Sequence, residues 1–126
     1  MIKDRAQKKM AARFCAVQGI VPFTEVVVRS PTGLEDAVVN ITDVDVLGLE
    51  IVRGGLVRRY VFDCKTAGRQ SAINRALWAG GLSAFVNADS AYVLQMKSVP
   101  DSHKLAANTF GVHIHTETSF ERYANS

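Results

Sequence analysis

Apolar runs alternate with amphipathic segments along the chain, a pattern that predicts a mixed helix-and-strand domain. Between residues 3 and 18 apolar side chains recur every three or four positions, which indicates a helix that ends at Gly19. Two runs rich in β-branched residues follow at 23–29 and 38–52, and a third ends at Lys65. We expect all three to be strands, because such side chains favour the half-buried surface of a sheet.

A second helix is expected over about residues 69–79, after the third strand. Its apolar side consists of three large side chains, Ile73, Leu77 and Trp78, and we expect the tryptophan to belong to the core. The consecutive glycines Gly80 and Gly81 are expected to close this helix.

The rest of the chain predicts a strand at 91–96, and then a helix that is capped by Asp101 or Ser102 and ends at Phe110 before Gly111. A short edge strand at 112–115 and a helical turn from Ser119 complete the order. This order indicates an α/β (α+β) fold with a central mixed sheet flanked by helices. No linker or repeat interrupts it, so we expect one domain over residues 1–126.

The hairpin at residues 43–65 carries charged side chains among apolar ones. We expect a three-residue loop, Arg53–Gly55, which commonly uses a left-handed glycine. That register sets Asp45 opposite Asp63, whereas a loop of the two glycines alone would place these acids on opposite faces. The other pairs of the expected register are Asp43 with Lys65, Val44 with Cys64, and Val46 with Phe62, the last two on a core face.

Two adjacent carboxylates repel each other unless a cation lies between them. Asp45 and Asp63 would suit Mg²⁺, with Mn²⁺ as a substitute, because such ions prefer oxygen ligands and keep waters that a substrate phosphate can replace. Lys65 shares the face of Asp63 and could reach the same phosphate or water. The alternative is structural, since most Asp-x-Lys triplets are solvated strand faces or ion pairs.

The two segments 42–48 and 61–66, which contain an acid on one hairpin strand and Asp-x-Lys on the next, resemble the PD-(D/E)xK nuclease superfamily. The resemblance implies a restriction endonuclease-like core: a helix, a three-stranded meander, a helix and a further strand. By position, Asp45 matches the first acid of the motif, and Asp63 and Lys65 match the second acid and the lysine.

The resemblance also implies roles for these residues. The two acids hold Mg²⁺, Lys65 orients or activates the hydrolytic water, and Gln70 matches a glutamine found beside the metal in several branches. Val44 stands where the name-giving proline would be, a frequent substitution in the superfamily. No glutamate lies in the first predicted helix, where many members carry an extra ligand, so the number of metal ions stays open.

Charge permits a polyanionic partner. The chain has 15 Lys and Arg against 12 Asp and Glu, a net charge of +3, and a pI of about 9.1. The basic residues expected to contact phosphates lie on the first helix and at the start of the second: Lys8, Lys9, Arg13, Arg69 and Arg75. A solvated basic helix face is the alternative.

Other chemistry is sparse. Cys15 and Cys64 fall in apolar patterns, so we expect reduced, buried thiols in a cytoplasmic protein. No apolar run is long enough to cross a bilayer, and the basic start of the chain lacks the apolar stretch of a signal peptide. His113 and His115 share a strand face, but no cysteine or acid is spaced to complete a zinc site with them.

Together these features predict a metal-dependent nuclease, a DNA endonuclease of repair, recombination or restriction and defence, with DNA favoured over RNA. Cutting both strands of a duplex usually needs two active sites, so we expect a homodimer. Two other classes stay open: a non-catalytic nucleic-acid-binding or assembly module on the same fold, and an interaction domain that binds no nucleic acid.

Overall fold

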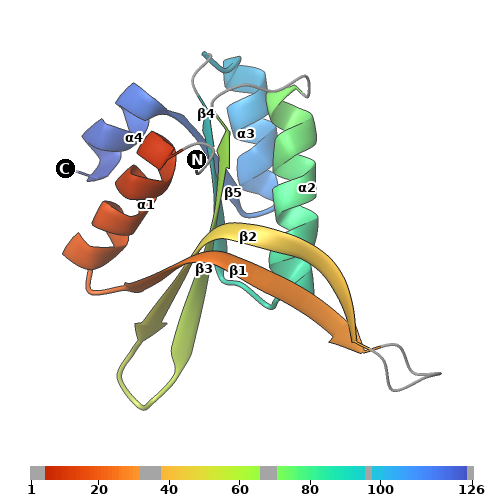
Figure 1. The fold of residues 1–126 in the computed structure, drawn as a ribbon. Coiled ribbons are helices and arrows are strands. Elements are labelled where there is room, and N and C mark those ends of the chain that lie inside the picture. Colours follow the sequence, from red (N-terminus) through yellow and green to blue (C-terminus); the bar gives the residue numbers. More distant parts are fainter. Residues whose placement is uncertain (1–4, 32–37, 66–70, 96–97, 125–126) are drawn as a thin grey trace.

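The computed structural model describes residues 5–31, 38–65, 71–95 and 98–124 (Figure 1). Its elements follow the expected order, with one more helix at the end: α1 (Arg5–Val17), β1 (Val21–Pro31), β2 (Val38–Ile51), β3 (Val57–Lys65), α2 (Ala72–Phe85), β4 (Ser90–Gln95), α3 (Asp101–Thr109), β5 (Val112–Thr116) and α4 (Glu117–Ala124). No helix in these described ranges is long and apolar enough to span a membrane.

The five strands form one sheet in the order β1-β2-β3-β4-β5. Neighbours are antiparallel from β1 to β3 and parallel from β3 to β5, where α2 and α3 make the crossovers. In Figure 1, α2 and α3 lie on one side of the parallel part of the sheet and α1 and α4 on the other. The predicted α+β fold with a mixed central sheet flanked by helices is therefore confirmed.

The sheet separates two apolar clusters, because alternate residues of its inner strands point to opposite sides. In β3, Val61 belongs to the cluster with α2 and α3, and Phe62 belongs to the cluster with α1 and α4. The second cluster is rich in aromatic rings; Phe62 and Tyr92 stack with centroids 4.9 Å apart. Cys15 and Cys64 are buried, free thiols in this cluster, as expected.

The predicted hairpin register is confirmed along the β2–β3 ladder, which pairs Val46 with Phe62 and runs to Ile51 with Val57. The backbone N–H of Val52 donates to the carbonyl of Leu56 at 2.8 Å, which closes a three-residue loop. Both of its glycines have positive φ angles, +88° and +80°, as such a loop requires.

The face assigned to Val44 is wrong. Val44 is buried, but in the cluster with Val28 and Val61, whereas Val46 packs with Phe62 on the other side. The β2–β3 ladder ends at Val46, and Figure 1 shows β1 and β2 sweeping away from the remaining strands. Strict alternation of side chains between two faces fails where a strand leaves its neighbour in this way.

The buried face of α1 also differs from the prediction. Lys8, expected on an exposed basic face, is buried, and its ammonium forms an ion pair with Glu25 of β1. Val17, expected on the apolar face, is exposed. Gln7 and Ala11 are buried as well. The buried side of this helix is therefore set by its contact with β1 and not by the apolar pattern alone.

The predicted end of α2 is wrong, since the helix continues through both glycines to Phe85. Gly80 is needed for packing: a Cβ at this position would lie 3.1 Å from Cδ2 of Phe110. The expected side-chain cap of α3 is also wrong, because Pro100 is the N-cap and makes no side-chain cap hydrogen bond. Gly111, with a φ of +79°, follows that helix as predicted.

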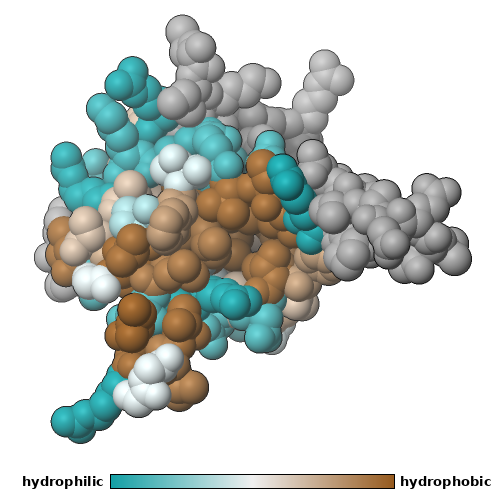
Figure 2. Space-filling view, turned by 60° about the horizontal axis from the view of Figure 1, so that its bottom comes forward, coloured by the Kyte–Doolittle hydropathy of each residue, from teal (hydrophilic) through white to brown (hydrophobic). Residues whose placement is uncertain are grey.

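The last helix, predicted only as a turn and tail, has a reciprocal cap. The N–H of Ser119 donates to Oγ1 of Thr116 at 3.2 Å, and the N–H of Thr116 donates to Oγ of Ser119 at 3.0 Å. Phe120 is fully buried against the aromatic cluster. Figure 2, in which the bottom of Figure 1 is turned forward, shows hydrophobic side chains across the middle of the surface and on the projecting hairpin between β2 and β3.

Gly48 is predicted to be essential for stability. A Cβ there would lie 2.7 Å from Cγ2 of buried Ile20, so Gly48→Ala should lower the free energy of unfolding by about 1–3 kcal/mol. Urea unfolding measures this cost. In the background Ile20→Ala the same change should cost less, and strict additivity of the two substitutions would contradict the proposed contact.

Stability should fall in acid because of His115. Burial lowers the pKa of this ring from 6.5 to about 4, so the unfolded chain binds a proton that the folded chain excludes. The contribution of His115 to the free energy of unfolding is then fully present above about pH 6.5 and is lost as the pH falls towards 4. It amounts to at most about 3 kcal/mol, an upper bound that solvent screening reduces. Urea unfolding across this range should show a shallower dependence for His115→Gln, and a smaller change for His113→Gln, because the charge of His113 also contributes to the lowered pKa of His115.

Candidate functional site

The acid on β2 is fixed by the neighbouring strand. Oδ2 of Asp45 accepts a hydrogen bond of 2.8 Å from the backbone N–H of Cys64, at the point where the β2–β3 ladder ends. The ladder stops one position short of Asp45, so the expected pairing of Asp45 with Asp63 stays a prediction. The side chain is partly buried, so one carboxylate oxygen is oriented by the backbone of β3.

The acid on β3 is buried and paired with a guanidinium. The side chain of Asp63 is only 4% exposed, and its Oδ2 forms an ion pair with Nη2 of Arg75, whose side chain is 13% exposed. Arg75 lies in the first half of α2, and its guanidinium carbon is 5.9 Å from the ring centroid of Trp78. A buried carboxylate is costly without a compensating charge, and Arg75 supplies one.

This arrangement fits the donor chemistry of a hard divalent ion. Two carboxylates from adjacent strands offer oxygen ligands, and the guanidinium at Asp63 shows that this buried acid requires a positive charge beside it. The described residues contain no group of three or more His, Cys, Asp or Glu side chains that could hold a metal. An ion held by Asp45 and Asp63 would therefore need water or a phosphate for its other ligands, unless a side chain outside the described ranges contributed one.

The remaining motif residues are described only in part. The backbone of Lys65 ends β3 and is paired with Gln95 of β4, two residues after Asp63. Arg69 and Gln70 lie outside the described residues. The roles predicted for Lys65, Gln70 and Arg69 stay predictions.

The expected phosphate contacts do not form one surface. Lys9 and Arg13 are exposed on α1, which covers the side of the sheet opposite α2 and Asp63. Lys8 and Arg75 are each held in an ion pair. No spacing rule could have indicated the partners of these two residues, because each ion pair depends on how a helix packs against the sheet.

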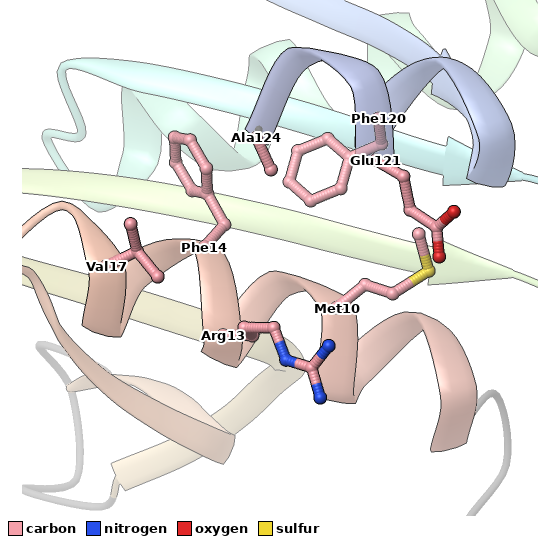
Figure 3. Close-up of a pocket in the computed structure, with 7 residues that line it drawn as sticks. All are labelled: Met10, Arg13, Phe14, Val17, Phe120, Glu121 and Ala124. Atoms are coloured by element: carbon pink, nitrogen blue, oxygen red, sulfur yellow. The ribbon is translucent and has the colours of Figure 1, made fainter. Parts of the chain in front are cut away.

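A pocket of about 240 Å³ between α1 and α4 was not predicted (Figure 3). Its lining is mostly apolar and includes Met10, Phe14 and Phe120, with Arg13 and Glu121 as its charged residues. The pocket lies on the α1 side of the sheet, away from the acids. Its described lining residues include no hydroxyl or thiol and one carboxylate, that of Glu121.

Sequence comparisons gave no relative: no family model and no curated protein matches the chain. Three solved structures match its fold. Protein AF1548, of unknown function, is 17% identical with a TM-score of 0.64, over 94% of this chain and 62% of that one. Protein VC1899 from Vibrio cholerae is 14% identical with a TM-score of 0.66, over 94% of this chain and 30% of that one.

The third structure is Can2 from Sulfobacillus thermosulfidooxidans in complex with cyclic tetra-adenylate. It is 8% identical to this chain with a TM-score of 0.63, over 97% of this chain and 33% of that one. These likenesses establish the fold alone. The chain spans less than two thirds of each of the three proteins.

Arg75 should be a stability residue as well as a site residue. Arg75→Met removes the charge that compensates Asp63 and should lower the free energy of unfolding by about 3 kcal/mol or more. Chemical denaturation measures the effect. The double variant Asp63→Asn/Arg75→Met should recover most of the loss, and a double variant as unstable as the sum of the two single variants would contradict the pairing.

Proposed function

We propose that the protein is a metal-dependent nuclease that hydrolyses phosphodiester bonds in nucleic acid, with DNA as the favoured substrate. The observation that supports the proposal is the hydrogen bond from the N–H of Cys64 to Asp45, which holds the Asp45 carboxylate against the peptide that follows Asp63 on β3. Lys65 lies two residues after Asp63 on the same strand. Asp45, Asp63 and Lys65 are the three positions at which the chain resembles the PD-(D/E)xK motif.

In this mechanism Asp45 and Asp63 would hold Mg²⁺, and the ion would supply Lewis-acid chemistry, namely polarisation of the scissile phosphate and a lower pKa for a coordinated water. The N–H of Cys64 holds Asp45 in place, so that its carboxylate is oriented before substrate arrives. Asp63 is held by Arg75 and the surrounding core. Lys65 would position the attacking water or stabilise charge that grows on the phosphoryl oxygens.

The structural likeness to Can2 supports only a general link to nucleotides. Can2 was solved with cyclic tetra-adenylate, a ligand built from nucleotides joined through phosphates. A shared fold at 8% identity does not transfer that ligand to this chain. It does favour a nucleotide or nucleic acid among possible partners, in agreement with the net charge of +3.

The second candidate is a non-catalytic module on the same fold. One observation favours it: the guanidinium of Arg75 already neutralises Asp63, so the buried acid does not depend on a metal for its stability. In that case the acid pair is structural, and any binding of nucleic acid would be independent of divalent ions.

Cleavage of supercoiled plasmid separates the candidates. We expect nicking with Mg²⁺ or Mn²⁺ and none with chelator, and a loss of at least about a hundredfold in rate for Asp45→Asn. Asp43→Asn is the matched control, because Asp43 is an exposed acid two residues away on the same strand and should leave the rate unchanged.

Lys65→Ala should lower kcat more than it raises KM, because the lysine is assigned to the chemical step rather than to binding. Metal-independent nicking, or equal rates for the Asp43 and Asp45 variants, would contradict the proposed site. Binding of plasmid without cleavage under any metal would favour the non-catalytic module.

A further inference from the structure

The outward side of α2 is uncharged along its whole length. The exposed residues of this helix include one polar side chain, Asn74, and are otherwise apolar or small: Leu77, Trp78, Gly81, Ala84 and Phe85. The single charged residue of the helix, Arg75, is turned to Asp63. The outward side of a surface helix normally carries charged and polar residues, so this surface is typical of an interface.

Gly81 lies at the centre of this surface, and no contact within the described chain explains it. A Cβ at Gly81 would meet nothing within 4 Å, in contrast to Gly80, where Phe110 lies close. Glycine destabilises a helix interior relative to alanine, so a glycine in open space carries a cost without an internal benefit. The benefit is explained if a backbone from outside the chain approaches at this point.

The residues around Gly81 are arranged symmetrically along the helix. Leu77 lies four residues before it and Phe85 four residues after it, so all three share one line on the helix surface. A hollow of about 430 Å³ opens beside this line, bordered by Trp78 and by Ile41 of β2. When two such helices cross antiparallel about a two-fold axis, Leu77 of each copy meets Phe85 of the other.

We propose that a second copy of this chain docks on this surface, with the two α2 helices crossing at Gly81. This inference goes beyond the nuclease proposal and does not depend on it. A two-fold interface requires that the same patch contact itself, which an uncharged surface permits on a chain of net charge +3.

The exposed area agrees with a weak to moderate dimer. Ile41, Leu77, Trp78 and Phe85 are 50%, 56%, 41% and 55% exposed. Each therefore presents on the order of 100 Å², and together they would bury on the order of 800 Å² over both copies. Specific interfaces bury about 1,200–2,000 Å², so neighbours such as Asn74 and Ala84 must contribute, and we expect dissociation in the micromolar range.

Sedimentation equilibrium over a range of concentrations tests the proposal. Wild type should shift from 13.7 kDa towards twice that mass as its concentration rises. Phe85→Asp should weaken the association at least about tenfold. Leu105→Asp is the matched control, because Leu105 is an apolar residue on α3 that is even more exposed than Phe85, and its substitution should leave the association unchanged.

Two substitutions at Gly81 make the test specific to the crossing. Gly81→Ala should weaken the dimer while the monomer melts at the same or a higher temperature, a combination that misfolding cannot produce. Gly81→Cys should form a disulfide between two copies on oxidation, since a residue on a two-fold axis faces itself, and Leu105→Cys should not. A wild type that stays monomeric, equal effects of Phe85→Asp and Leu105→Asp, or a dimer that Gly81→Cys does not cross-link would each overturn the proposal.

Discussion

The burial of Asp63 in β3 is the constraint on which the rest of the site depends. β3 lies between β2 and β4, with Val61 packed on one side of the sheet and Phe62 on the other. A carboxylate in such a strand loses most of its hydration, and the chain must supply a positive charge beside it. Arg75 does so from α2, on the side of that helix that also carries the buried Ala72, Ala76 and Ala79.

The same requirement explains why the neighbourhood suits a cation. Asp45 adds a second carboxylate, which is oriented by the N–H of Cys64, the residue after Asp63. Among the described side chains, two acids and one guanidinium meet in this part of the molecule. Our proposal is that a divalent ion binds beside Arg75 without displacing it.

Local chemistry made the hairpin predictable. The Arg53–Gly55 loop determines the register of β2 and β3, and the glycines take the positive φ angles that this loop needs. The register in turn brings Asp45 to the backbone of β3 at Cys64, so this contact followed from residues close in sequence. The mixed sheet was predictable for the same reason, since each crossover consists of consecutive elements.

Features that depend on distant contacts could not be predicted. Gly80 indicated the end of a helix, but it is explained by the ring of Phe110, which directly follows α3. Lys8 was expected in solvent because its partner Glu25 belongs to a different element. Trp78 was expected in the core because it is large and apolar, but it is 41% exposed. Size and spacing alone do not show which apolar residues stay on the surface of a single chain.

Binding of Mn²⁺, followed by electron paramagnetic resonance in the absence of nucleic acid, tests the central claim that Asp45 and Asp63 form a metal site. The account predicts that wild type and Asp43→Asn bind the ion alike and that Asp45→Asn loses at least about tenfold in affinity. Equal binding by Asp45→Asn and wild type, or no binding by wild type, would contradict it and leave the acid pair with a structural role.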